Sequence, residues 1–219
     1  MAYPQLNYKA NGESGWRDQD STTGALLYAY NSLTSRDLEF FSKLKSTQEI
    51  ILNPIPAITI CHGSPYQVNQ KLLPEDSATI EIINRVKTSM ILCGHTHNQR
   101  KIVHGSKCVL NPGAVGIPLY SGGKTQFMIL HSMEGQWLEE FISLEYDVER
   151  VIKDMQVEKL HFHAPYWSMI TEHILHKGTV THGEILSRAM QLCKEETGES
   201  IWPNIPEKCW SRAYKEIIG

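Results

Sequence analysis

Three short apolar segments of this chain have the length of a β-strand, and each ends abruptly in polar residues and glycine. They are residues 58–61 before His62, residues 90–93 before Gly94, and residues 108–110 before Asn111. Aliphatic and β-branched runs bounded by turn residues are typical of buried strands. A sheet holds each strand end rigidly, and the loop beyond it leaves open space for a ligand. The pattern therefore predicts a sheet whose strand ends carry a functional site.

Histidines follow two of these strand ends. His62 comes directly after the first, and His95 and His97 come just after the second. The adjacent Gly63 and Gly94 remove side-chain bulk and permit unusual backbone angles. Neutral imidazole is a good ligand for zinc, iron and similar ions. A single histidine at a strand end is more often a hydrogen-bonded structural residue. The metal-site hypothesis therefore depends on the fact that three strands in succession end in the same way, in polar residues and glycine.

Periodicity along the chain predicts a sheet-rich part followed by a helical part. We expect strands at residues 50–52, 57–61, 89–93, 102–103, 107–110, 126–131 and 137–144. We expect helices at residues 26–30, from 34 or 35 onward, and at 76–86, 148–155, 164–176, 184–196 and 207–218. Residues 1 to about 24 have no clear period and are expected to form a loop. The predicted division is a domain at 1–146 and a helical extension at 147–219.

Composition and charge limit the partners. The 219 residues are 41% hydrophobic with a net charge of −3, so the chain lacks the field that attracts nucleic acid or an anionic membrane. The five cysteines form no Cys-x-x-Cys motif, and we find neither a secretory signal nor a membrane span. We therefore expect a cytoplasmic protein with no nucleic-acid and no membrane partner. A phosphorylated small molecule, as substrate, would need local positive charge such as a metal.

Taken in order, the three motifs carry a family resemblance. They are His62-Gly63-Ser64-Pro65, Gly94-His95-Thr96-His97 and the segment from Asn111 to Gly116. Together they resemble the second half of the calcineurin-like metallophosphoesterases, especially the compact bacterial phosphodiesterase-like group, over residues of about 57–131. The resemblance implies an α/β (α+β) fold, here a partial β-sandwich flanked by helices with a helical C-terminal appendage.

The resemblance also implies a chemistry. In this family two divalent metal ions, drawn from Mn, Fe, Ni or Zn, clamp the phosphate while a bridging hydroxide attacks phosphorus. By resemblance, His62 and His95 would bind one metal and His97 the other. The loops containing Gly63, Gly94, Asn111 and Gly113 would support the site.

The chain departs from the family pattern before His62. The Asp-x-His, Gly-Asp and Gly-Asn-His motifs that supply the remaining ligands and the proton donor are absent there. Asp18 and Asp20 lie in this part, but their context is best explained as a solvated loop. A catalytic zinc site normally uses three protein ligands and a water. We therefore expect an incomplete metal site, a truncated domain with poor hydrolysis or none, and open sheet edges that an oligomer contact could cover.

Three hypotheses remain open at this point, and none assigns catalytic residues or a specific substrate. The first is a shortened metal-dependent phosphoesterase, either a phosphodiesterase or a phosphatase. The second is a non-catalytic remnant or binding module that keeps the second half of the fold. The third is a mononuclear site made by His62, His95 and His97 themselves.

Other motifs have simpler interpretations. The pairs His161 with His163 and His173 with His176 are expected to make ordinary hydrogen bonds. The aromatic residues of the helical part are expected to pack it; they are Trp167, Trp202, Trp210, Tyr166 and Tyr214. Arg100 and Lys101 are expected to be a solvated strand start, with a phosphate contact as the alternative.

Overall fold

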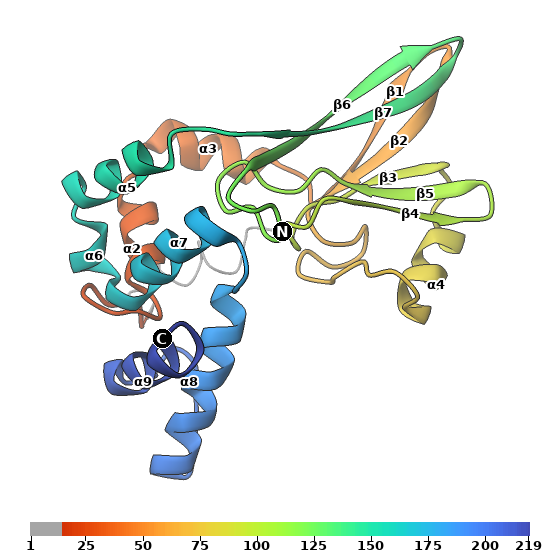
Figure 1. The fold of residues 1–219 in the computed structure, drawn as a ribbon. Coiled ribbons are helices and arrows are strands. Elements are labelled where there is room, and N and C mark those ends of the chain that lie inside the picture. The colour runs from red at the N-terminus through yellow and green to blue at the C-terminus, as the bar shows by residue number, and fades with distance from the viewer. Residues whose placement is uncertain (1–14) are drawn as a thin grey trace. The chain divides into compact units, whose positions relative to one another are not determined.

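The computed structural model describes residues 15–219, which form two compact units (Figure 1). One unit is Lys45–Tyr146, and the other joins Asp147–Gly219 to the described residues of Met1–Leu44. The expected division at 1–146 and 147–219 therefore differs from the observed contacts in one respect. Residues 15–44 pack with the C-terminal helices in one unit.

A five-stranded sheet forms the centre of the Lys45–Tyr146 unit, with the strand order β1-β2-β3-β5-β4. The strands are β1 (Thr47–Leu52), β2 (Ile55–Cys61), β3 (Met90–Leu92), β4 (Arg100–His104) and β5 (Lys107–Asn111). The three central strands β2, β3 and β5 are parallel, whereas the outer strands β1 and β4 pair antiparallel with their neighbours. Parallel neighbours end at the same edge of the sheet, so the polar residues after β2, β3 and β5 are brought together.

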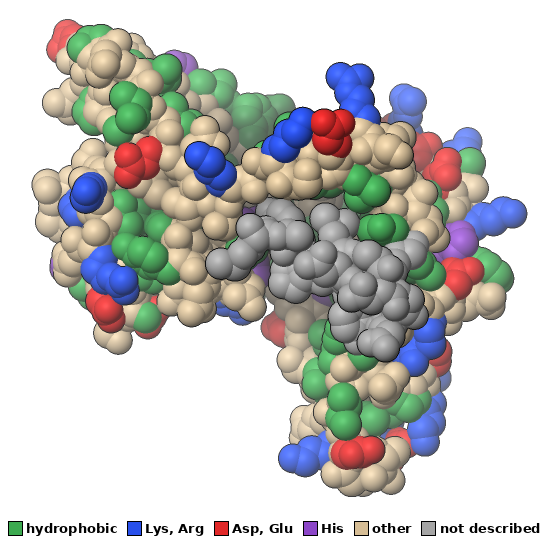
Figure 2. Space-filling view, turned by 180° about the vertical axis from the view of Figure 1, so that it is seen from behind, with side chains coloured by type: hydrophobic (Ala, Val, Ile, Leu, Met, Phe, Trp, Pro, Cys, Tyr) green, Lys and Arg blue, Asp and Glu red, His purple; other side chains and the backbone are tan. Residues whose placement is uncertain are grey.

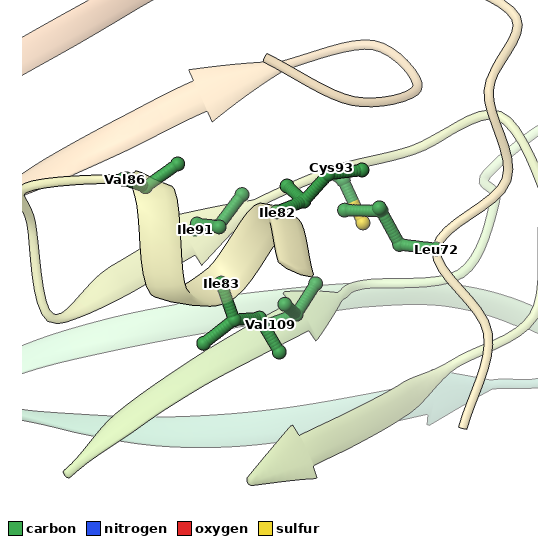
Figure 3. Packing of buried hydrophobic residues seen from close by; sticks show 7 residues of the cluster. All are labelled: Leu72, Ile82, Ile83, Val86, Ile91, Cys93 and Val109. Carbon is green, nitrogen blue, oxygen red and sulfur yellow. The ribbon is translucent and has the colours of Figure 1, made fainter. Parts of the chain in front are cut away.

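The central strands are apolar because both of their faces are covered. On one face, α4 (Ser77–Arg85) begins at the N-cap Asp76, whose carboxylate accepts from the amides of Ala78 and Thr79. A buried cluster packs between this helix and the sheet (Figure 3); its members are Leu72, Ile82, Ile83, Val86, Ile91, Cys93 and Val109. These side chains follow the helical period on α4 and alternate along β3.

A two-stranded sheet covers the other face. It consists of β6 (Thr125–Met133) and β7 (Gln136–Leu144). The buried side chains Ile58, Met90 and Leu110 pack against partly buried residues that include Met128, Leu130, Trp137 and Phe141. The side-chain amide of Gln99 also donates to the carbonyl oxygens of Phe127 and Ile142, at 3.0 and 3.2 Å. The predicted mixed fold of helices and strands is confirmed.

The second unit is helical throughout its described residues. Its helices are α2 (Gly24–Asn31), α3 (Ser35–Lys43), α5 (Val148–Val157), α6 (Leu160–His163), α7 (Pro165–Lys177), α8 (His182–Thr197) and α9 (Glu207–Ile217). Six of these were predicted, and the four-residue α6 was missed because it is too short to show a period. Gly178 and Gly198 end α7 and α8 in the left-handed conformation that glycine tolerates.

Residues 17–23 belong to this helical unit through buried hydrogen bonds. Asp20 is only 8% exposed, and its carboxylate accepts from the amides of Thr22 and Thr23 and from the Arg17 guanidinium. The fully buried Trp210 donates from its indole nitrogen to the hydroxyl of Thr22 at 2.9 Å. The expectation that Asp20 lies in a solvated loop is wrong, because its oxygens satisfy the backbone at the start of α2.

The surface matches the modest net charge. On the face shown in Figure 2, lysine and arginine side chains lie among aspartate and glutamate and do not form one continuous patch. Within residues 15–219, none of the helices combines the length and apolar character that crossing a bilayer requires.

Candidate functional site

His62 and His95 lie side by side at the carboxyl edge of the five-stranded sheet. Their strands β2 and β3 are parallel neighbours in which Ile60 lies opposite Leu92. The amide of Gly94 donates to the carbonyl oxygen of His62 at 2.7 Å, which ties the two strand ends together. The imidazole rings meet edge to face, with centroids 5.3 Å apart. The structure therefore brings together two residues that are 33 positions apart in the sequence.

His97 is held on the same turn in a defined ring orientation. Its Nδ1 lies 2.9 Å from the carbonyl oxygen of Ile117, and its own carbonyl accepts from the amide of Leu119 at 3.1 Å. A carbonyl oxygen only accepts, so Nδ1 is the donor of this bond. Metal-binding histidines are commonly oriented by a hydrogen bond of this kind.

The turn that carries His95 and His97 is strained. Both residues have left-handed backbone angles, with φ of 63° and 52°. Such angles in non-glycine residues cost on the order of 1 kcal/mol each and are concentrated at functional sites. Placing the two histidines on a turn lets them point in directions that a regular strand would not allow.

Asn111 holds this turn from the neighbouring strand end. Its side chain is buried, and its amide nitrogen donates to the carbonyl oxygen of Gly94 at 2.6 Å and to the Thr96 hydroxyl at 3.0 Å. Its amide oxygen accepts from the Gly113 amide at 3.0 Å. The Arg100 guanidinium also donates to the Thr96 hydroxyl. Sequence reasoning missed the parts played by Thr96 and Arg100; the only available signal was that both border the histidine motif.

The supporting glycines differ in what they require. A Cβ at Gly63 would lie 2.3 Å from the carbonyl oxygen of Val68, so no side chain fits there. Gly113 has a φ of 84°, and a Cβ would lie 2.5 Å from the side chain of Gln126. A Cβ at Gly94 would meet only ordinary contacts, the nearest being His62 O at 3.6 Å. Steric necessity therefore applies to Gly63 and Gly113 but not to Gly94.

Electrostatics favour the neutral form of His95. Burial lowers its pKa below the ordinary value, and the nearby His62 and Lys71 lower it further. Neutral imidazole is the form that binds a metal. Burial also lowers the pKa of the Arg100 guanidinium, whose Nε has no hydrogen-bond partner among the described residues. Arg100 is thus half-buried against the turn instead of being a solvated strand start, whereas Lys101 pairs with Glu139.

The donor set in the described residues does not fit a complete metal centre. Three imidazoles lie on neighbouring strand ends, but residues 15–219 contain no group of three or more histidine, cysteine, aspartate or glutamate side chains placed to hold one metal ion. Among residues 15–219, no aspartate or glutamate joins His62 and His95 in such a group. The assignment of His62, His95 and His97 as metal ligands therefore stays a prediction, and no reaction step can be traced through a metal from these residues.

The histidines of the helical unit make local contacts. Each lies beside a partner in the same unit: His161 beside Glu172 at 2.9 Å, His163 beside Asp18 at 2.5 Å, His173 beside Thr179 at 3.4 Å and His176 beside Glu149 at 3.6 Å. The expected hydrogen-bonding roles account for His161, His163 and His173, whereas His176 makes an ion-pair contact.

The comparisons with known proteins identify the class. The family described as the calcineurin-like phosphoesterase superfamily domain matches residues 30–135 of this chain. The sequence comparison with curated proteins gave no match. The suspected family is thus confirmed by a signal that covers the motifs of His62, His95 and Asn111.

Two solved structures show the same fold. A hypothetical protein from Pyrococcus horikoshii OT3 superposes with a TM-score of 0.57 at 21% identity, covering 70% of this chain and 59% of that protein. A metallophosphoesterase from Sphaerobacter thermophilus superposes with a TM-score of 0.53 at 18% identity, covering 68% of this chain and 64% of that protein. The chain thus spans less than two thirds of the length of either structure.

Proposed function

We propose that this chain carries the histidine-bearing part of a metal-dependent phosphoesterase site and that alone it hydrolyses phosphoesters weakly or not at all. The observation that carries the proposal is the His62–His95 pair, with ring centroids 5.3 Å apart and, within residues 15–219, no carboxylate grouped with it. The family match supplies the class of reaction. Because the described residues provide too few metal ligands for a complete site, we expect the hydrolysis to be weak.

The proposed role of each histidine follows from the nitrogen atoms that it could offer to a metal. A metal pair in this family would stabilise charge on the phosphate oxygens and supply a hydroxide. From this chain, His62 and His95 would offer imidazole nitrogen to one metal position, and His97 would offer Nε2 to a second. With fewer than three protein ligands at either position, affinity for Mn²⁺ or Zn²⁺ should be weak. Asn111 would act only by holding the turn.

The proposed substrate is a phosphorylated small molecule. The net charge of −3, and the mixed charges on the face shown in Figure 2, give no support for nucleic acid as a partner, because such partners need a basic face. All five cysteines are free, which supports a reducing cytoplasm as the proposed location. An oligomer contact over the open sheet edges stays a proposal.

The alternative is a binding module without catalysis. The observation that favours it is the absence, in residues 15–219, of any carboxylate grouped with the histidines. Such a module would keep the fold and the turn while turning over no substrate. It differs from the first proposal in binding no metal at all.

Metal titration and a hydrolysis assay separate these outcomes. Isothermal titration with Mn²⁺ would be run on the wild type, His62→Ala and His95→Ala, with His104→Ala in the distant β4-β5 turn as matched control. We expect weak binding that the first two changes abolish and the control retains. Equal binding by all four proteins would refute ligation, and no binding by any of them would favour the binding module.

Hydrolysis of bis(p-nitrophenyl) phosphate with Mn²⁺ tests the activity. We expect a rate well below the usual enzymatic kcat of about 1 s⁻¹ or more. A normal rate that His95→Ala abolishes would show that the site is complete in this chain. His97→Ala tests the mononuclear three-histidine hypothesis, because that site would lose its metal with this change, whereas His62 and His95 alone would keep theirs.

A further inference from the structure

An apolar groove lies beside the open edge of β6. It has a volume of ≈ 490 Å³, and its lining includes Ile60, Leu92, Met128 and Leu130. Ile60 and Leu92 come from the five-stranded sheet, whereas Met128 and Leu130 come from β6. The five-stranded sheet therefore extends past the edge of the two-stranded sheet that covers it. The groove is an incompletely covered part of the apolar layer between the two sheets.

The backbone of β6 faces this groove with free pairing positions. Among the described residues β6 pairs only with β7, and the amide of Gln126 donates away from that pair, to the carbonyl oxygen of Ala114 at 3.0 Å. Alternate residues of a strand direct their amides to the same side. The amides of Met128 and Leu130 therefore point to the open edge, where no other described backbone group bonds them.

Charge distinguishes this edge from the other sheet edges of the unit. Exposed edge strands usually carry charged residues that prevent pairing with another chain. The other three edge strands do so: β1 has Glu49, β4 has Arg100 and Lys101, and β7 has Glu139 and Glu140. The nine residues of β6 include no lysine, arginine, aspartate, glutamate or proline. Its one titratable residue, His131, lies 2.7 Å from Glu140 of β7. The edge without lysine, arginine, aspartate or glutamate is also the edge that borders the apolar groove.

We propose that β6 is a docking edge for one extended, uncharged segment of a partner polypeptide, which adds a strand to the β6-β7 sheet. Its backbone would pair with Met128 and Leu130, and alternate side chains would cover Ile60 and Leu92. The two solved structures with this fold contain polypeptide that this chain does not match, so the fold accommodates more chain than these residues supply.

A second copy of this chain is a poor occupant. If β6 of two copies paired antiparallel, both five-stranded sheets would lie on the same side of the joined sheet. Each of them extends past its own β6 at Ile60 and Leu92, so the two would overlap. A single strand without a sheet beneath it avoids this clash. The proposal is independent of metal binding by His62 and His95.

Fluorescence anisotropy tests the docking edge. The probe is a fluorescein-labelled octapeptide of alternating valine and threonine between two lysines, titrated with the full chain. The matched control is the same peptide N-methylated at each central amide, which keeps the apolar side chains but cannot pair. We expect saturable binding of the first peptide and roughly tenfold or weaker binding of the second, because backbone hydrogen bonds are lost.

A variant of the protein tests the same edge by changing β6 instead of the peptide. Met128→Pro removes one outward amide without removing a bond to β7, since proline is tolerated at an open strand edge. It should weaken peptide binding. Because Met128 also packs in the apolar layer between the two sheets, its melting temperature should fall, so binding is compared at a temperature at which circular dichroism shows that the variant is folded. Equal binding of the two peptides to the wild type, or no saturable binding of the unmethylated one, would overturn the proposal even if Met128→Pro fails to fold.

Discussion

The amide nitrogen of Gly94 donates a 2.7 Å hydrogen bond to the carbonyl oxygen of His62, across the ends of β2 and β3. This bond continues the parallel pairing by one step beyond the strands and carries it into the loop that holds His95. The two imidazole rings thereby keep a fixed separation. The geometry of the candidate site is therefore a property of the sheet edge and of the turn that Asn111 supports.

Gly63→Ala should destabilise the Lys45–Tyr146 unit. Its added Cβ would lie 2.3 Å from the carbonyl oxygen of Val68 and 2.8 Å from that of Gln70, and these backbone atoms cannot move cheaply. We expect a loss of about 1–3 kcal/mol in the free energy of unfolding, measured by urea titration. Gly116→Ala is the control, since a Cβ there meets nothing within 4 Å. Equal stability of the two variants would contradict the steric role of Gly63.

Asn111→Asp should loosen the histidine turn. The aspartate can still accept from the Gly113 amide, but it cannot donate to Gly94 O and the Thr96 hydroxyl as the asparagine does at 2.6 and 3.0 Å. Losing these two buried hydrogen bonds and placing a carboxylate oxygen against the Gly94 carbonyl oxygen should cost about 1–3 kcal/mol. Urea titration gives the stability, and hydrogen exchange at residues 94–97 should accelerate. Asn84→Ala, on the exposed face of α4, should change neither quantity.

Thr22→Val should destabilise the helical unit. The change keeps the shape of the side chain but leaves the indole N–H of Trp210 without the acceptor that it has at 2.9 Å. Because both residues are buried, we expect a loss of about 1–3 kcal/mol, read from the unfolding followed by Trp fluorescence. Thr22→Ser keeps the hydroxyl and should cost clearly less. If both variants were as stable as the wild type, residues 17–23 would not be an integral part of this unit.

His173 should make stability depend on pH in the mildly acidic range. Burial lowers its pKa below the ordinary 6.5, and the positive charges of Lys177 and His176 lower it further. Between the folded pKa and 6.5 the unfolded chain binds more protons, so stability rises with pH. The contribution is fully present above pH 6.5 and is lost as the pH falls through this window.

His173→Gln isolates that contribution. The difference in unfolding free energy between wild type and variant should grow from pH 5 to pH 7 in favour of the wild type. An NMR titration of the His173 ring should give a pKa below 6.5 in the folded protein. A constant difference, or one that shrinks as pH rises, would contradict the burial-dominated shift.

Strands and helices with strong local patterns were predictable. The run Ile58–Cys61 is apolar apart from Thr59, whose buried hydroxyl is hydrogen-bonded to that of Thr88, and both faces of β2 are covered; such a run identifies a buried strand without knowledge of its neighbours. Thr34 with Asp37 forms a capping box at the start of α3, which is also a local signal. By contrast, Leu160–His163 is a single helical turn whose existence depends on contacts with α2, α5 and α7.

The sequence by itself determined the family, the strand ends and the three histidines, because each of these depends on residues close together in the chain. Only the tertiary structure decided what lies across from them. It placed His62 beside His95 and hydrogen-bonded the Asn111 side chain to the turn at Gly94. It also joined Thr22 to Trp210, far along the chain, by a buried hydrogen bond. The edge of β6, which has no lysine, arginine, aspartate or glutamate, was left beside an apolar groove. Strand pairing and side-chain packing join distant residues, and local periodicity carries no information about those partners.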